Sequence, residues 1–385
     1  MARGSVRQRG ITWTVVFDEP RADGRRRQRS KGGFRTRKDA ERYLREQLVS
    51  LDAGTYMAPR KLTVATYLAE HWLPAMQARG LRPSTLERYE SHVRCAITPI
   101  LGGLPLQGLM PTHLNRLYGD LRTAGRAPKT IRNIHGVLSK ALADAERWGL
   151  VGRNAARLAD VPAVVRPKLR VWSPEQTRAF LAAVANDRLF AAWLLAATTG
   201  MRRGELLGLR WEDIDLDVGV VRVAQARVRA GNHVVAGEPK TARGRRTLAL
   251  DPATATALRQ HRKRQTEERL LAGPHYADSG LAFTMPDGRP IHPNRFSLWF
   301  RRHARAAGLP AIRLHEMRHS YATAGLAPGI PPKVMSERLG HATVAFTLDT
   351  YTSALPAMDK SAAEVVASLI LGTEEIVVEM SQHDR

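Results

Sequence analysis

The spacing of two histidines, an arginine and a tyrosine is suited to a reaction on an anionic substrate. His315 and Arg318 are three residues apart, so on a helix they share one face. His341 follows Gly340, a residue suited to end a helix, and is expected to lie exposed to a cleft. Tyr351 comes ten residues later. Because no carboxylate pair or cysteine pair accompanies these four residues, they favour a reaction on an anion. Phosphate is the obvious candidate.

A second set of residues lies upstream of this segment. The stretch 199–206 is Thr-Gly-Met-Arg-Arg-Gly-Glu-Leu, and Lys240 lies in an expected β-hairpin. The downstream boxes follow in order, with His-x-x-Arg at 315–318, Leu-Gly-His at 339–341 and then the tyrosine. Each box alone is a weak pattern, but all of them in this order make a specific one. In these boxes the chain resembles the tyrosine recombinases, the phage integrase family.

The resemblance implies an enzyme that cleaves and rejoins DNA by transesterification at a phosphate. The tyrosine would form a 3′-phosphotyrosyl bond, so that religation needs neither ATP nor a metal. Two arginines would clamp the nonbridging oxygens, His315 would take the proton from the tyrosine and Lys240 would protonate the leaving 5′-hydroxyl. His341 would donate a hydrogen bond to the phosphate, and Glu205 is expected to orient the site rather than react. The implied catalytic set is Arg202, Lys240, His315, Arg318, His341 and Tyr351, with no cofactor and no metal.

The charge of the chain indicates a polyanionic partner. Its 385 residues carry 60 Lys and Arg against 36 Asp and Glu, a net charge of +24, and arginine supplies 50 of the basic residues. Nucleic acid therefore comes before a membrane surface. Cys95 is the only cysteine, which excludes an intrachain disulfide and a cysteine-based zinc site. Without an apolar signal core or a membrane-spanning run, the protein is expected in the cytoplasm, associated with the nucleoid.

Residues 1–55 are expected to form a small basic DNA-binding domain. A strand is predicted at 11–17, a turn at 23–24, and a helix from Lys38 to about residue 48 that Thr36 would cap. In shape and charge the segment resembles the three-stranded arm-binding domains of some integrases. The candidate DNA-binding residues are Arg25, Arg26, Arg27, Arg29, Lys31, Arg243 and Arg245. Arg246 is also expected to touch the DNA backbone.

The remainder divides into a helical domain and a mixed one. Four helices are expected between 63 and 147, one of them starting at Ser84 with Glu87 in a capping box, and the unit resembles the family's core-binding domain. Ser173 is expected to cap the first helix of the catalytic part. Three short strands are expected there, at 220–223, 233–235 and 246–250.

The predicted fold is multidomain and mainly α, with small β-sheets: an N-terminal three-stranded sheet plus helix, a helical domain, and an α+β catalytic domain. The predicted boundaries are 1–55 for the arm-type DNA-binding domain, 62–155 for the helical, SAM-like core-binding domain, 168–372 for the catalytic domain and 373–385 for a C-terminal tail. An amphipathic helix is expected at 359–371, packing in its own chain or against a neighbour.

The function implied by the resemblance is that of a site-specific recombinase, the integrase of a phage or integrative element. The implied partners are double-stranded DNA attachment sites, a homotetramer assembled on DNA, an excisionase or other directionality factor, and a host DNA-bending protein. Two other functions stay open. A noncatalytic DNA-binding regulator would explain the charge but not the six-residue set, and a type IB topoisomerase-like nicking and joining enzyme would share the chemistry of Tyr351.

Overall fold

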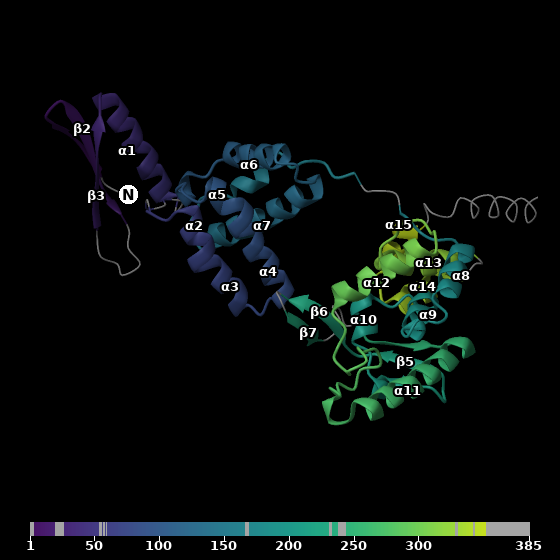
Figure 1. Ribbon diagram of the computed structural model, residues 1–385. Coiled ribbons are helices and arrows are strands. Elements are labelled where there is room, and N and C mark those ends of the chain that lie inside the picture. Colours follow the sequence, from purple (N-terminus) through teal and green to yellow (C-terminus); the bar gives the residue numbers. More distant parts are fainter. Residues whose placement is uncertain are drawn as a thin grey trace, which may run out of the picture. The chain divides into compact units, whose positions relative to one another are not determined.

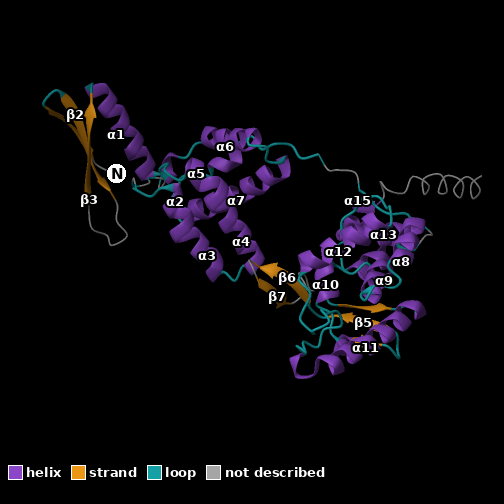
Figure 2. Cartoon of the chain, in the orientation of Figure 1, coloured by secondary structure: helices purple, strands orange, loops and turns teal. Residues whose placement is uncertain are grey.

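The computed structural model of the chain divides into two compact units, Met1–Arg166 and Pro167–Arg385. Helices predominate in both, with small antiparallel sheets (Figures 1 and 2). No helix in the described ranges combines the length and the apolar character that a membrane crossing needs. The structure describes residues 4–19, 27–53, 56, 58, 60–165, 169–230, 233–237, 244–327, 330–341 and 343–351.

The first unit begins with a three-stranded antiparallel sheet, in the order β1-β2-β3, with a helix packed on one face (Figure 1). The elements are β1 (Gly4–Arg9), β2 (Thr12–Glu19), β3 (Arg27–Phe34) and α1 (Arg37–Asp52). Thr36 caps α1 as predicted, since its side chain accepts a hydrogen bond of 3.1 Å from the amide of Asp39. Val15, Phe17 and Ala40 form the buried centre between the sheet and the helix.

A helical bundle makes up the rest of this unit. Its segments are α2 (Val64–Thr66), η1 (Tyr67–Trp72), α3 (Leu73–Ala78), α4 (Pro83–His92), η2 (Val93–Ile97), α5 (Thr98–Leu101), η3 (Leu106–Gly108), α6 (Pro111–Thr123), α7 (Pro128–Arg147) and η4 (Ala155–Leu158). Trp72 is fully buried and belongs to the hydrophobic core of the bundle. The predicted capping box at Ser84 is wrong: the helix begins at Pro83, which suits a first helical position, and Arg82 precedes it without a side-chain cap. Cys95, on η2, is exposed.

The second unit combines helices with two small sheets. Its elements are α8 (Pro174–Ala183), α9 (Phe190–Thr199), α10 (Arg203–Leu207), η5 (Trp211–Asp213), β4 (Ile214–Asp215), β5 (Val220–Val223), β6 (Ala226–Ala230), β7 (His233–Gly237), β8 (Arg246–Ala249), α11 (Pro252–Ala272), η7 (Gly273–His275), α12 (Pro293–Ala306), α13 (Leu314–Leu326), α14 (Pro332–Leu339) and α15 (Val344–Tyr351). One sheet has the order β4-β5-β8, and β6 and β7 form a separate hairpin.

The three predicted strands of the catalytic part are present as β5, β7 and β8, but they do not pair with one another in chain order. The middle one, β7, pairs with β6, a strand that we did not predict, whereas β8 pairs with β5. Residues 238–243, which lie between β7 and β8 and include Lys240, are outside the described residues, as is the amphipathic helix predicted at 359–371.

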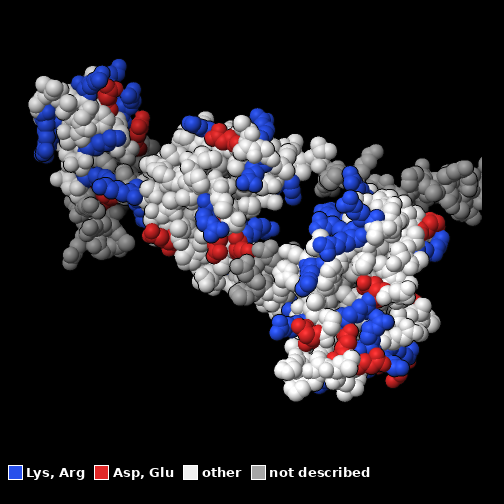
Figure 3. All heavy atoms as spheres, in the orientation of Figure 1, with Lys and Arg blue, Asp and Glu red and all other residues white. Residues whose placement is uncertain are grey.

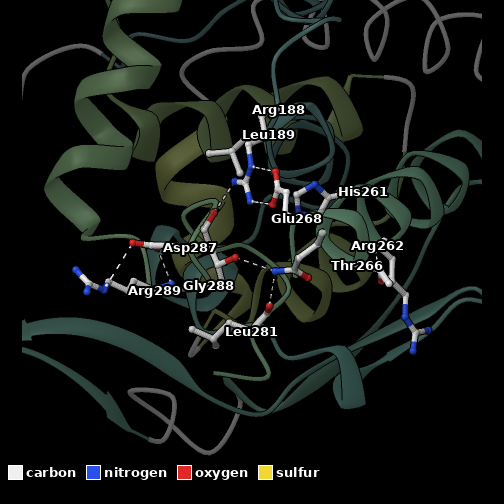
Figure 4. A network of polar contacts seen from close by, with 12 residues as sticks. Arg188, Leu189, His261, Arg262, Thr266, Glu268, Leu281, Asp287, Gly288 and Arg289 are labelled. Atoms are coloured by element: carbon white, nitrogen blue, oxygen red, sulfur yellow. Dashed lines mark hydrogen bonds and ion pairs between the residues drawn. The ribbon is translucent and has the colours of Figure 1, made fainter. Parts of the chain in front are cut away.

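Aromatic packing and one polar tie fix the helices that lead to the site. Trp193 of α9 stacks on Phe296 of α12, with ring centroids 4.2 Å apart. Arg188, just before α9, donates to both carboxylate oxygens of Glu268 on α11 and to the carbonyl of Thr284 at 2.6 Å (Figure 4). Helix α9 is therefore held in its first half by α11, through Arg188, and by α12, through Trp193.

Candidate active site

Two glycines end helices at one place in the second unit. Helix α9 ends at Gly200 and helix α14 at Gly340, each with a φ of +63°, where a residue with a Cβ is strained. A Cβ on Gly200 would lie 2.6 Å from Cδ1 of Tyr321 and 2.9 Å from Cδ2 of Leu339. Glycine is therefore required there for α9 to approach α13 and α14. The predicted end of the second helix at Gly340 is confirmed.

Arg318, on α13, connects these two helix ends. Only 3% of the residue is exposed, and its Nη1 donates to the carbonyl oxygen of Gly200 at 2.9 Å while Nη2 donates to that of Leu339. A guanidinium fixed by main-chain oxygens needs no reorganisation when an anion arrives, so the charge is preorganised.

Arg202, the residue before α10, reaches the same place from another direction. Its Nη2 donates to the carbonyl oxygen of Gly340 at 3.0 Å and its Nη1 to Oε1 of Glu205 at 2.8 Å. Its side chain remains 37% exposed, whereas that of Glu205 is 3% exposed. Burial would raise the pKa of Glu205, but the hydrogen bond and charge of Arg246, together with Arg202, hold that pKa below its ordinary value. Glu205 is thus a buried carboxylate that orients Arg202, as the sequence indicated.

Arg246 occupies a position that the sequence did not indicate. Its side chain is 7% exposed, and its Nη2 donates to Oε2 of Glu205 at 2.9 Å. Its Nε donates to the carbonyl of Arg338 at 2.6 Å and its Nη1 to that of Gly244 at 3.1 Å. The expectation that Arg246 touches the DNA backbone is therefore wrong, because its guanidinium is turned inward. It ties the start of β8 to the last turn of α14 and to the carboxylate behind Arg202.

His341 follows directly after the end of α14 and is buried, with 7% of the residue exposed, rather than open to a cleft as expected. Its Nδ1 lies 2.8 Å from Oγ1 of Thr347 on α15. Burial, followed by the charges of Arg318 and Arg202, lowers the pKa of His341 to about 3. Tyr351 is the last residue of α15, one helical turn after Thr347. The imidazole thus fastens the helix that carries the tyrosine to the end of α14.

His315 lies in the first turn of α13, on the rim of the site. The residue is exposed, but its ring packs edge-to-face with that of His319, with centroids 5.0 Å apart. Crowding by protein atoms, then the charges of His319 and Arg318, lowers the pKa of His315 to about 4. Both site histidines are therefore neutral at pH 7 in the DNA-free protein.

The arrangement is suited to hold an anion. Lys and Arg side chains gather on the second unit around α12 (Figure 3), and two guanidiniums with fixed donors lie beside the two histidines. Such donors match the oxygens of a phosphate. Within the described residues, no group of three or more His, Cys, Asp or Glu side chains is placed to hold a metal ion.

Three family models match the chain in order. Residues 5–51 match an Arm DNA-binding domain, residues 66–121 the N-terminal SAM-like domain of phage integrases, and residues 170–358 the phage integrase family domain. The last match contains all six predicted catalytic positions. The chain belongs to the phage integrase family. It is accordingly an enzyme of the tyrosine recombinase type.

Relatives of the recombinase come from bacteria and phages. A XerC-like tyrosine recombinase of Caldanaerobacter subterraneus is 29% identical over 356 residues, which cover 88% of this chain and 91% of the relative. The integrase of Mycobacterium phage L5 is 27% identical and covers 86% of this chain and 88% of its own. The Tn1549 transposon integrase in complex with transposon right end DNA has a TM-score of 0.66 at 25% identity, covering 79% of this chain and 98% of that one. A lambda integrase tetramer bound to a Holliday junction shares the fold, with a TM-score of 0.55 at 19% identity, over 88% of this chain and 95% of that one.

The N-terminal sheet of the recombinase places its basic residues on two faces. Arg29 lies opposite Phe17 and Lys31 opposite Val15, so both are on the face that α1 covers. There Arg29 pairs with Glu19 at 3.3 Å, and Nζ of Lys31 lies 4.2 Å from the ring centroid of Tyr43 on α1. The register thus gives these two predicted DNA-binding residues partners within the domain.

The other face of the sheet carries basic residues that the sequence did not single out. Arg7 lies opposite Thr14 and Arg9 opposite Thr12, and both arginines are exposed. The missed signal is the alternation in β1, which can be read only once the pairing of β1 with β2 is known.

Several predicted site residues cannot be placed in this way. Arg25, Arg26, Lys240 and Arg243 lie outside the described residues, and the side chains of Arg27 and Tyr351 are not described. Arg245 is exposed just before β8. Their roles stay predictions.

Proposed function

We propose that the protein is a site-specific DNA recombinase, an integrase that inserts or excises a mobile element. Tyr351 attacks a backbone phosphate, forms a 3′-phosphotyrosyl bond and releases a 5′-hydroxyl, and the 5′-hydroxyl of a partner strand then displaces the tyrosine. The observation that carries this proposal is the meeting of two arginines and two histidines at the ends of α9, α13 and α14. Helix α15, which ends at Tyr351, is bonded to that place through Thr347.

In this proposal the two arginines stabilise the charge of the transition state. Arg318 is held by two carbonyl oxygens, and Arg202 by Glu205 and the carbonyl of Gly340, so neither must reorganise as charge develops on the phosphate. Loss of one such donor typically costs about 10²–10³ in rate. Because guanidiniums do the work of a cation here, the scheme uses no metal and no cofactor.

The proton transfers follow from the state of the histidines. With a pKa of about 4 in the DNA-free protein, His315 is neutral at pH 7, so a ring nitrogen is free to accept a proton. The negative charge of a bound phosphate would raise this pKa and so strengthen His315 as the base for Tyr351, whose phenol has an ordinary pKa of about 10. If Thr347 donates to Nδ1 of His341, the neutral ring carries its proton on Nε2 and can donate it to a phosphate oxygen. Lys240 is the proposed acid for the leaving 5′-oxygen.

The proposal extends to the partners and the division of the chain. Domains at 1–55, 62–155 and 168–372 would act on arm sites, on the core site and in cleavage, in that order, with 373–385 as a tail. The solved relatives bound to transposon DNA and, as a tetramer, to a Holliday junction support attachment-site DNA and a homotetramer on it as partners. An excisionase or other directionality factor and a host DNA-bending protein complete the set, and the reaction would take place in the cytoplasm, at the nucleoid.

The test is covalent trapping on DNA. The full chain is footprinted on the DNA that flanks its own gene, and the protected core is made into a nicked duplex from which the 5′-hydroxyl fragment diffuses away. We expect an SDS-resistant protein–DNA adduct that forms in EDTA. Tyr351→Phe should bind this duplex as the wild type does and form no adduct.

Two matched tyrosines serve as controls. Tyr276→Phe, a change of the same size away from the site, should keep the adduct. Tyr321 is the rival nucleophile, because its ring contacts Gly200 and its hydroxyl accepts from Nε of Arg338 at 2.7 Å. An adduct that survives Tyr351→Phe but disappears with Tyr321→Phe would overturn the assignment. Binding without any adduct would favour a noncatalytic regulator, and nicking and closing without strand exchange a topoisomerase-like enzyme.

A further inference from the structure

A cavity of about 500 Å³ adjoins the candidate active site. It lies between the start of α10, the middle of α12 and the first turn of α13, and its lining includes four arginines, Arg202, Arg203, Arg301 and Arg313, with His315 beside them. Arg202 and His315 belong to the site already described. The other three arginines have no part in the mechanism above, so the cavity holds more positive charge than the scissile phosphate requires.

Consecutive arginines at the start of α10 extend in different directions. Arg202 donates to the end of α14, whereas Arg203 donates to α12, with its Nη1 at 2.8 Å from Oγ of Ser297 and 3.3 Å from the carbonyl of Pro293. The side chain of Arg203 is therefore directed away from a phosphate that Arg202 and Arg318 would hold. The side chain of Arg203 defines a second position for an anion, on the α12 side of the first.

Only some of the arginines in the cavity are paired with a carboxylate. Arg313 pairs with Glu316 at 2.8 Å. In the part of the chain that the structure describes, Arg203 is bonded to neutral oxygens only, and Arg301, which lies four residues after Ser297 and therefore on the same face of α12, makes no ion pair. Burial lowers the pKa of the Arg203 guanidinium, which is the mark of a partly desolvated cation without a compensating charge. An anion in the cavity would supply that charge.

We infer that this cavity binds a second DNA backbone phosphate, the neighbour of the scissile phosphate on the cleaved strand, with Arg203 and Arg301 as its ligands. The inference rests on the proposed function, because Arg202 and His315 line both places. Phosphates recur about every 3.4 Å of helix axis along one strand, so a strand held at Arg202 brings the next phosphate into the adjoining cavity. Two fixed phosphates would set the direction of the strand through the site, which one phosphate cannot do.

The experiment replaces single phosphates in the DNA by uncharged methylphosphonates. Tyr351→Phe protein is titrated with core duplexes that carry one methylphosphonate at each position from two before to two after the scissile phosphate. We expect weaker binding, by about tenfold, at the scissile position and at one of its two neighbours. Arg203→Gln and Arg301→Gln should bind the all-phosphate duplex less tightly but lose the sensitivity at that neighbour alone, while the scissile position keeps its effect.

Arg302→Gln is the matched control. It removes the same charge from the next residue of α12, which is exposed and does not line the cavity, so its methylphosphonate profile should equal that of the wild type. Arg301→Gln keeps the test valid if Arg203→Gln unfolds, because Arg301 is exposed. Sensitivity at a neighbouring phosphate that persists in Arg301→Gln and Arg203→Gln, or that is absent in the wild type, would overturn the inference. Binding is read without cleavage, so a failure of the adduct assay counts against the proposed function and not against this site.

Discussion

The arginines of the catalytic unit and those of the N-terminal sheet are held in opposite ways. Arg318 and Arg246 are buried, with their guanidiniums bonded to carbonyl oxygens and, for Arg246, to a buried carboxylate. Arg7 and Arg9 are exposed on the face of the sheet that α1 leaves open. A buried, oriented cation acts at one point and contributes to rate, whereas an exposed one contributes to attraction that salt screens. Substitutions in the two regions should therefore fail in different assays.

The largest expected effect is at Arg318. Arg318→Gln should lower the single-turnover rate of adduct formation about 10²–10³-fold at saturating protein, because a preorganised donor is lost from the transition state. DNA affinity at low salt should fall far less than the rate, by about tenfold at most, because only one contact to the scissile phosphate is lost. The measurement is adduct formation on the nicked duplex together with a binding isotherm. A loss confined to affinity would place Arg318 with the exposed arginines and break the comparison.

Next comes Arg246, which we expect to act through Glu205 on Arg202. Arg246→Met should reduce the free energy of unfolding by about 3 kcal/mol, because the buried carboxylate of Glu205 loses one of its two arginine partners, and should slow adduct formation. Denaturant unfolding and adduct kinetics measure the two effects.

A double-mutant cycle separates positioning from simple loss of stability. If Arg246 positions Arg202, then Arg246→Met should cost much less rate in an Arg202→Gln background than in the wild type. Glu205→Gln in the Arg246→Met background should recover stability but not rate. Additive rate losses would show that Arg246 has a structural role only.

A smaller effect is expected from acid. The pKa of His341 is lowered to about 3 in the folded chain, below its ordinary value of 6.5, so between these values the unfolded chain binds a proton that the folded one does not. The free energy of unfolding should therefore fall as the pH falls from about 6.5 towards 4. Urea midpoints measured across this range for the wild type and for His341→Gln test the claim. An equal slope in both would show that His341 is not the group responsible.

The smallest effect belongs to the sheet. Arg7→Gln combined with Arg9→Gln should reduce the slope of log K against log salt by about 1.8 on arm-site DNA, at about 0.9 for each phosphate contact. Adduct formation on a short core duplex should not change. The matched pair is Arg29→Gln with Lys31→Gln, which removes the same charge from the face that α1 covers and should leave the slope unaltered. The reverse result would mean that DNA lies against the α1 side.

The features that could be predicted from the sequence are those that depend on neighbouring residues. Residues at helix ends carry local signals: Thr36 and Ser173 cap helices where predicted, and Gly340 ends one, because a cap depends on a few neighbouring residues. His315 and Arg318 lie on one helix, α13, as their spacing of three residues predicted, because that spacing repeats on one face of a helix. The prediction that His341 follows a helix end is confirmed, but the prediction that it is exposed is wrong, because contact with α15 buries it.

The features that could not be predicted depend on contacts between segments that are distant in the sequence. The inward turn of Arg246 requires Arg338 and Glu205 to lie beside it, and no local pattern announces that. The face on which Arg29 lies is set by the register between β2 and β3, where a shift of one residue would reverse it. Ser84 was mistaken for a cap because Pro83 before it competes for the start of the same helix.

The single cysteine gives the chain a built-in reporter position. Cys95 is exposed on η2 of the helical bundle, and no other thiol competes with it. A maleimide dye would therefore mark each copy once, without any engineered residue. Stepwise photobleaching of labelled protein on a single DNA molecule would then count the copies in the complex, and the proposed homotetramer on a pair of attachment sites should give four steps.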